Sequence, residues 1–203
     1  MKLHWDRVDD NHIKAYVKLG KRLRKVLLPI FEDLQFRLAF RLLPVRSRFW
    51  FLEHANPGIR KCVSNGCNAI ESEQHLFFDC TLASSLWRHV LGIVRKLRVR
   101  DVWTDHEAIV ADVWHVLRSV TLHFVWSDRN RCLFDGRQPT PTLAALQVVL
   151  TTFAAHIRYF QRRLYSPDEQ NLLRDVLKRL DAQSCLGEFV DRHPGITGIR
   201  TSA

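Results

Sequence analysis

Hydrophobic side chains recur every three or four positions along most of this 203-residue chain. That spacing places them on one face of an α-helix, with polar side chains on the other face. Five stretches show it most clearly: 12–28, 81–98, 105–127, 142–163 and 167–182. We expect Thr81 to cap the second of these helices, and Pro167 with Asp168 to begin the last. The pattern predicts a mostly α-helical protein.

Residues 31–54 combine helical spacing with a mixture of aromatic and basic side chains. Pro44 should break this segment into two short helices, because proline lacks the amide proton that a helix interior needs. The aromatic residues Phe36, Phe40, Trp50 and Phe51 interleave with Arg37, Arg41, Arg46 and Arg48. We expect the rings to lie in the core and the arginines in solvent. The alternative is that the rings stack on nucleic-acid bases while the arginines contact phosphates.

Positive charge is concentrated in the first half of the sequence. The formal net charge is +10, and residues 1–100 carry all of this excess, because residues 101–203 are neutral overall. The change suggests a basic region, 1–100, with a folded core at about 30–98, then a neutral helical region, 101–190, and a flexible tail, 191–203. A domain boundary near 98–104 would fit this division. A single helical bundle fits the hydrophobic pattern equally well.

A field of this sign attracts polyanions, and nucleic acid is the commonest intracellular one. The basic residues that we expect to contact RNA or DNA are Lys18, Lys21, Arg22, Arg24, Lys25, Arg41, Arg46, Arg48, Arg60 and Lys61. The first five also resemble a short nuclear localisation patch. The alternative is a solvated basic surface that has no partner.

The sequence shows no signal for secretion or for membrane insertion. It contains no run of eighteen apolar residues. Its start, MKLHWDRVDDNHIKAY, lacks the apolar segment of a signal peptide. Five cysteines, an odd number, also argue against a disulfide framework. We therefore expect an intracellular protein, nuclear or cytoplasmic, that is neither secreted nor bound to a membrane.

Cysteine and histidine gather in the stretch CVSNGCNAIESEQHLFFDC, which has the spacing C-x4-C-x7-H-x4-C. The four candidate ligands are Cys62, Cys67, His75 and Cys80. Three thiols and one imidazole make one complete tetrahedral zinc set, and they leave no position open for a substrate. Asn65-Gly66 favours a turn, with a possible short β-hairpin, that aims the first two sulfurs at one point. One structural Zn²⁺ is the expected cofactor; ordinary buried cysteines and a core histidine are the alternative.

Three strings around this cluster resemble a known module. RLLPVRSRFWFLE (41–53), ESEQHLFFDC (71–80) and TLASSLW (81–87) are similar to the zinc-binding domain at the C-terminal end of reverse transcriptases from non-LTR (LINE-type) retrotransposons. VWSDRNRCLFDG (125–136) is similar to a segment that often follows that domain. The resemblance covers about residues 30–135 and implies the same four zinc ligands. The family usually has two residues between its first two cysteines, whereas this chain has four.

The resemblance implies nucleic-acid binding, with RNA favoured because such elements must bind their own transcript. A reverse transcriptase also needs paired aspartates on a strand turn to hold two metal ions. The only Asp-Asp pair, Asp9-Asp10, has no flanking apolar strands. We therefore expect a module that is not an enzyme and has no small-molecule substrate. The alternative function is a structural or protein-interaction domain, in which zinc only holds the fold and residues 105–182 bind a protein.

Overall fold

The computed structural model describes residues 14, 27–64, 66–95, 107–164 and 166–181. Its elements are α2 (Pro29–Ala39), the 3-10 helix η1 (Arg46–Leu52), the π-helical turn η2 (His75–Asp79), α3 (Thr81–Arg95), α4 (Glu107–Phe134), α5 (Thr142–Arg163) and α6 (Pro167–Asp181). These residues contain no β-strand, and an isolated antiparallel bridge joins Lys61 to Ile70. The prediction of a mostly α-helical fold is therefore confirmed. The predicted tail, 191–203, and nearly all of the predicted helix 12–28 lie outside the described residues.

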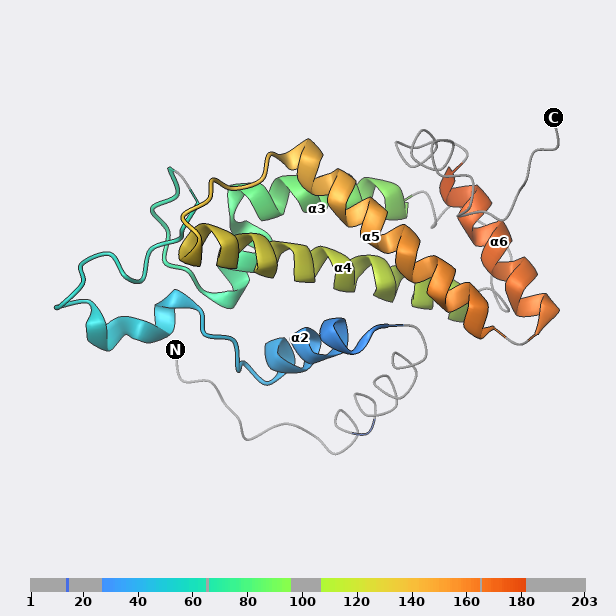
Figure 1. The fold of residues 1–203 in the computed structure, drawn as a ribbon, viewed down its shortest axis with the longest axis horizontal. Helices are drawn as coiled ribbons and strands as arrows, with labels where there is room; N and C mark the ends of the chain where they lie inside the picture. Colours follow the sequence, from blue (N-terminus) through green and yellow to red (C-terminus); the bar gives the residue numbers. More distant parts are fainter. Residues whose placement is uncertain (1–13, 15–26, 65, 96–106, 165, 182–203) are drawn as a thin grey trace.

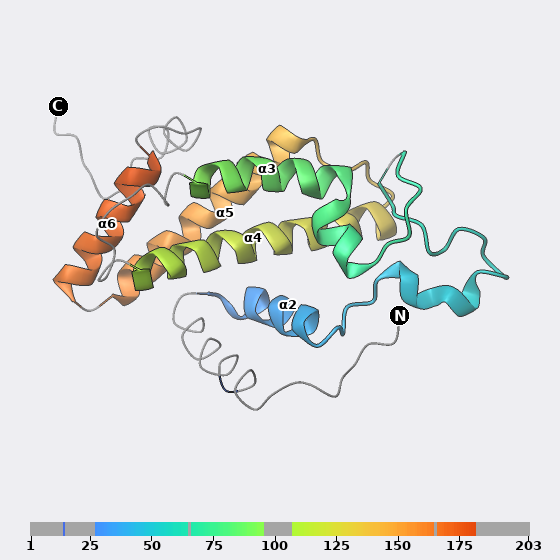
Figure 2. The same cartoon turned by 180° about the vertical axis from the view of Figure 1, so that it is seen from behind.

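The long helices run roughly lengthwise through the molecule, with α4 between its neighbours (Figures 1 and 2). α3 and α5 pack on one side of α4, and α2 packs on the side away from α3 (Figure 2). α6 crosses one end of this bundle. η1 and the loop that leads to η2 lie at the opposite end (Figure 1). The bundle thus positions the cysteine-rich segment at one tip of its long axis.

One hydrophobic core joins the basic and neutral halves of the sequence. Its buried side chains extend from Leu27, just before α2, to Leu177 in α6. α4 contributes at the centre, where Val113, Val116 and Val120 are at most 2% exposed. Burying each such side chain stabilises the fold by roughly 1.5–3 kcal/mol. The described residues therefore fit a single bundle, and the charge change near 98–104 does not mark a break in the core.

α2 ends before Pro44, as the sequence predicts. Two hydrogen bonds between backbone groups cap its C-terminus. The amide of Leu42 donates to the carbonyl of Arg37 at 2.7 Å, and that of Arg41 donates to Leu38 at 3.2 Å. This pair of bonds is a Schellman motif, which needs one residue in the left-handed region. Arg41 takes that place with a φ of 53°. The two predicted short helices are present, and the second one, η1, is a 3-10 helix.

The expectation that the aromatic residues of 31–54 lie in the core is wrong for four of them. Phe36, Phe40, Trp50 and Phe51 are 45%, 43%, 67% and 61% exposed. α2 faces the core with Phe31 and Leu34 instead. Because a helix has only one inward face, the side chains at the other positions must point outward. η1 buries none of its residues, so Trp50 and Phe51 remain in solvent.

α4 continues seven residues beyond the end that the sequence predicts, from residue 127 to Phe134. The polar residues of this last stretch are partnered inside the protein. Asp128 is buried and accepts hydrogen bonds from the backbone amide and the hydroxyl of Thr140 and from Arg131. These bonds tie the end of α4 to the loop before α5. Because the last stretch of α4 is polar, the spacing of hydrophobic residues does not reveal that it is helical.

α5 is the only helix of the described residues that is long and apolar enough to cross a bilayer by length and composition. Half of its apolar window is buried within the protein. Its buried residues pack in the core together with those of α4 and α3. Core helices commonly pass the same test, so α5 does not indicate a membrane protein.

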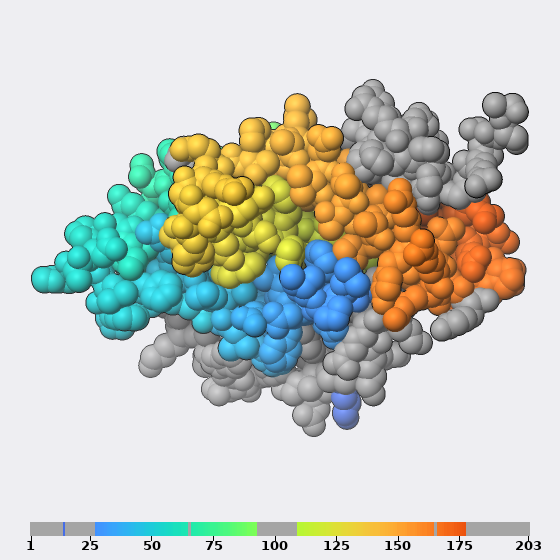
Figure 3. Space-filling view, viewed as in Figure 1, coloured from blue at the N-terminus to red at the C-terminus, as the bar shows by residue number. Residues whose placement is uncertain are grey.

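Two histidines and one phenylalanine join α2 to the bundle. Phe31 of α2 contacts the ring of His123 in α4, at a centroid distance of 4.7 Å, and that of His156 in α5, at 4.4 Å. The surfaces of α2 and α5 meet on the face shown in Figure 3. The Nδ1 of His156 donates to the carbonyl of Thr152 at 2.8 Å. Burial lowers the pKa of both histidines below the ordinary value of 6.5, and the nearby His156 lowers the pKa of His123 further.

These lowered pKa values predict that the fold is less stable in acid. Below about pH 6.5 the two histidines bind protons in the unfolded chain but resist protonation in the folded protein. The free energy of unfolding therefore decreases as the pH is lowered. The contribution of each histidine is at most about 1.4 kcal/mol per pH unit. Replacing His156 with leucine (His156→Leu) should make the free energy of unfolding, measured with urea between pH 7 and 5, fall less steeply than in the wild type. Equal slopes in the two proteins would contradict this prediction, and ligand protonation at the cysteine cluster affects both equally.

Candidate metal centre

The four predicted ligands converge on one point. The Sγ atoms of Cys62, Cys67 and Cys80 and a ring nitrogen of His75 all lie within 4.8 Å of one another. Cys62 Sγ is 3.8 Å from Cys80 Sγ, and Cys67 Sγ is 3.3 Å from His75 Nε2. Cys62 and Cys80 are buried, whereas the other two are half-buried. This cluster could bind one metal ion.

A turn brings the first two cysteines together. The amide of Cys67 donates to the carbonyl of Ser64 at 3.0 Å, and Gly66 takes a φ of +74°. That backbone conformation is one that glycine adopts at little cost, as the Asn65-Gly66 pair predicts. The flanking backbone pairs only briefly, through the bonds from the Cys62 amide to the Ala69 carbonyl at 2.8 Å and from the Glu71 amide to the Arg60 carbonyl at 2.9 Å. The possible hairpin is therefore reduced to the single bridge beside the cluster.

The last two ligands are aligned by the π-helical turn η2. His75 and Cys80 are five residues apart, so a regular α-helix would separate their directions by roughly 140°. The amide of Cys80 instead donates to the carbonyl of His75 at 2.8 Å, a bond across five residues. This wider turn places both side chains on one side. Ser72 starts it by accepting a hydrogen bond from the His75 amide at 3.1 Å.

η2 is also anchored from behind by an aromatic cluster. The indole Nε1 of Trp87 in α3 donates to the carbonyl of Phe77 at 2.6 Å. Phe77 is fully buried, and its ring lies against Trp126 of α4 at a centroid distance of 6.5 Å. The ligand turn is thus fixed between α3 and α4, which lowers the entropy lost when a metal binds.

Cys80 stands at the N-terminus of α3. It has an extended backbone, and its carbonyl accepts the amide of Ser84 at 2.8 Å, so it occupies the cap position. The prediction that Thr81 caps this helix is therefore wrong by one residue, and Thr81 is the first helical residue. Hydrogen bonds, first from the Cys62 thiol and then from Ser64 and the Leu82 amide, lower the pKa of Cys80 to about 4. A thiolate at this end of a helix is also favoured by the helix dipole.

Cys62 shows the opposite shift when no metal is bound. Its hydrogen bond to the Cys80 sulfur raises the pKa of Cys62, and burial raises it further. Two sulfurs 3.8 Å apart cannot both be ionised cheaply in a buried place. A bound cation would remove this repulsion, since metal ions bind thiolates and displace their protons. The electrostatics therefore favour a cation at the centre of the four donors.

A buried ion pair connects the cluster to the helical bundle. Glu71, which is fully buried, accepts from Nη2 of Arg129 at 2.6 Å and from its Nε at 3.1 Å. The same carboxylate oxygen accepts the backbone amide of Arg46 at 3.0 Å. The guanidinium of Arg129 also donates to the carbonyl of Pro44 and lies 5.1 Å from the ring of Trp126. Glu71 thereby holds together the start of η1, the metal loop and α4.

Sequence reasoning did not identify this pair, although both residues lie in strings that it singled out. Glu71 begins ESEQHLFFDC, and Arg129 lies in VWSDRNRCLFDG. Charged residues in those two strings look like surface positions when each is considered alone. The only available signal was that an acid and a base stand in the two strings 58 positions apart.

The ten basic residues proposed to contact nucleic acid are divided by the structure. Lys18, Lys21, Arg22, Arg24 and Lys25 lie outside the described residues. Arg41 and Lys61 are exposed, and Arg60 is half-buried. Arg48 is bound to Glu73 but keeps 40% of its side chain exposed. Arg46 has a structural task, since its guanidinium donates to the carbonyls of Gly58 and Ile59.

No protein family, curated protein or solved structure matches this chain. The resemblance to a retrotransposon zinc-binding domain therefore rests on the sequence strings alone.

The buried pair predicts a large loss of stability when only its base is removed. Arg129→Met leaves the Glu71 carboxylate buried without its counter-charge, which typically costs about 3–5 kcal/mol. Urea unfolding monitored by circular dichroism would measure this loss. Adding Glu71→Gln to Arg129→Met should recover part of it, because no uncompensated charge then remains.

Arg48→Met provides the matched control, because Arg48 pairs with Glu73 near the surface. This variant should lose less than about 1 kcal/mol. Equal losses for Arg48→Met and Arg129→Met would contradict a special role of the buried pair.

Proposed function

We propose that this chain is a zinc-stabilised nucleic-acid-binding module without catalytic activity. The observation that carries the proposal is the convergence of three thiols and one imidazole on one point. Zinc–sulfur bonds of about 2.3 Å in a tetrahedron put neighbouring sulfurs about 3.8 Å apart. The 3.8 Å between Cys62 and Cys80 agrees with that value. Soft thiolate ligands favour zinc over magnesium or calcium.

A structural role for the metal follows from the donor set. Four protein ligands complete the coordination of zinc and leave no position for water or substrate. The ligands also come from two separate backbone arms, the Cys62–Cys67 turn and η2. A bound zinc would join these arms and hold the loop between α2 and α3 on the bundle.

Nucleic acid is the proposed partner because of the charge of the chain. The net charge of +10 belongs entirely to residues 1–100, which include the metal cluster. Arg41 and Lys61 are exposed in that part. Resemblance to the C-terminal domain of non-LTR retrotransposon reverse transcriptases favours RNA and a nuclear or cytoplasmic location, and suggests that the chain derives from such an element.

The second candidate function is a protein-interaction domain in which zinc only holds the fold. Phe134 and Leu143, at the end of α4 and the start of α5, favour it, because they are 75% and 74% exposed. Most other apolar side chains of residues 109–177 are buried in the core. A stable dimer on a sizing column, with no binding to any nucleic acid, would support this function.

Metal analysis tests the centre of the proposal. We expect one zinc per chain by inductively coupled plasma mass spectrometry, and loss of zinc and of helical circular dichroism in Cys80→Ser. Cys132→Ser is the matched control, because Cys132 is a free thiol outside the ligand set, and it should keep its zinc. A folded wild-type protein without zinc would overturn the proposal.

Salt dependence tests the nucleic-acid part. Binding of a labelled RNA should weaken at least about tenfold between about 50 and 200 mM salt, because phosphate contacts release counterions. Lys61→Gln should lower the slope of log affinity against log salt by about one. Arg37→Gln, at a residue that pairs with Asp33 on α2, should leave the slope unchanged. An affinity that barely responds to salt would argue against phosphate contacts.

A further inference from the structure

Trp50 and Phe51 form an exposed pair of rings on η1, which we call the aromatic ridge. They are 67% and 61% exposed. Their centroids lie 6.2 Å apart and their planes are nearly perpendicular, at 89°. Rings in an edge-to-face arrangement do not cover one another as stacked rings do. The ridge therefore offers aromatic faces to a third planar group.

The ridge stands on a backbone that is held in place. The amide of Arg46 donates to Oε1 of Glu71 at 3.0 Å, and that of Ser47 donates to the Glu71 carbonyl at 2.9 Å. Val45, directly before η1, is fully buried. These contacts tie the start of η1 to the residue that also pairs with Arg129. Exposed rings on a fixed support lose little entropy on binding, which is a property of binding sites.

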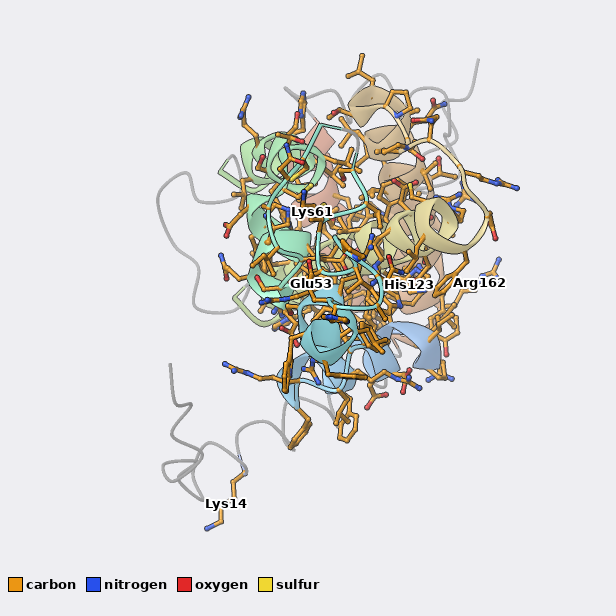
Figure 4. All side chains as sticks on the ribbon, turned by 90° about the vertical axis from the view of Figure 1, so that its left-hand side faces the viewer. Lys14, Glu53, Lys61, His123 and Arg162 are labelled. Carbon is orange, nitrogen blue, oxygen red and sulfur yellow. The ribbon has the colours of Figure 1, made fainter. Side chains whose placement is uncertain are left out.

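Arg48 lies two residues before the ridge, and Lys61 is bonded through its amide to Gly58 in the loop that follows η1. Arg48 uses Nη2 to bind Glu73, and its side chain remains 40% exposed with further donors available. Lys61 is exposed, and Figure 4 labels it and Glu53 in a view along the long axis from the end that carries η1. The carboxylate of Glu53 accepts the amide of Gly58 at 2.9 Å. This end of the molecule thus carries exposed cations together with carboxylates that each accept at least one hydrogen bond.

The position of η1 favours one kind of ligand for the aromatic ridge over another. It lies at the end of the long axis, beyond the ends of the long helices (Figure 1). A partner helix needs an apolar groove, whereas bases stack on single exposed rings and leave their phosphates to nearby cations. A projecting pair of rings on the same short helix as Arg48 fits the second kind of ligand.

We propose that the aromatic ridge stacks on unpaired bases of single-stranded nucleic acid, with Arg48 and Lys61 near the phosphates. This inference rests on the proposed nucleic-acid binding and assigns it a site and a strand type. The bases of a duplex already stack on each other, so the ridge selects single strands. RNA and DNA share this chemistry, and sequence plays little part because every base has an aromatic face.

The test uses the full chain, purified with its metal, and fluorescence anisotropy with labelled 20-nucleotide oligo(U), oligo(dT) and a duplex of mixed sequence. Trp50→Ala and Phe51→Ala should each weaken binding to both single strands by about 5- to 100-fold. Their binding to the duplex should change little. Leu143→Ala is the matched control, because Leu143 is 74% exposed on α5, and it should bind like the wild type. Circular dichroism and metal content verify that all variants are folded.

Two results would overturn the proposed role of the ridge, and they differ in what they imply for the broader proposal of nucleic-acid binding. If the wild type binds single strands in a salt-dependent way and both ridge variants bind equally well, the site is wrong but nucleic-acid binding stands. If the wild type binds no nucleic acid, both proposals fall. In that case, loss of self-association or of binding to anionic phospholipid vesicles in Trp50→Ala would assign the ridge to a protein or a lipid surface.

Discussion

The carboxylate of Glu71 is the contact on which the arrangement of this protein depends. It joins three segments that are distant in sequence: the start of η1, the metal loop and α4. A buried charge of this kind is tolerated only while its partners stay in place. Arrangements of the chain that separate Glu71 from these partners are therefore unfavourable. The counter-charge is Arg129, which lies in the neutral half of the sequence, residues 101–203. The described parts of the basic and neutral halves therefore share one core, although their charge differs sharply.

The metal cluster is built on the same framework. Ser72, directly after Glu71, caps the helical turn that leads into η2, and Cys80 follows the last residue of η2 at the start of α3. A cation at the four donors would neutralise the thiolates and fix the start of α3 in one step. The helix in turn favours the thiolate of Cys80 through its N-terminal amide. Metal binding and helix packing thus support each other, as expected where ligands lie on secondary structure.

The sequence predicted those features that depend on local spacing. The helices at 81–98, 142–163 and 167–182 follow from apolar periodicity, and the four donors follow from cysteine and histidine spacing. The buried pair of Glu71 and Arg129 was missed because no local pattern tells a buried charge from a solvated one. The end of α4 was missed for the same reason, since Asp128 is satisfied by Thr140 across a loop. The exposure of Trp50 was missed because aromatic residues are usually buried, and only the packed structure shows which ones the core has no room for.

The exposed rings of Trp50 and Phe51 are informative because other aromatic side chains of this protein are buried. Phe31 and Phe77 are buried and make ring contacts inside the bundle, so the fold does use aromatic residues where they pack. Trp50 and Phe51 stand instead on a segment that is fastened at its base by Glu71 and by Arg46. Holding hydrophobic rings in water gives no stability, and fastening them in place costs conformational entropy. An exposed aromatic pair that stands next to Arg48, on a segment held by Glu71, is therefore better explained by a ligand than by folding.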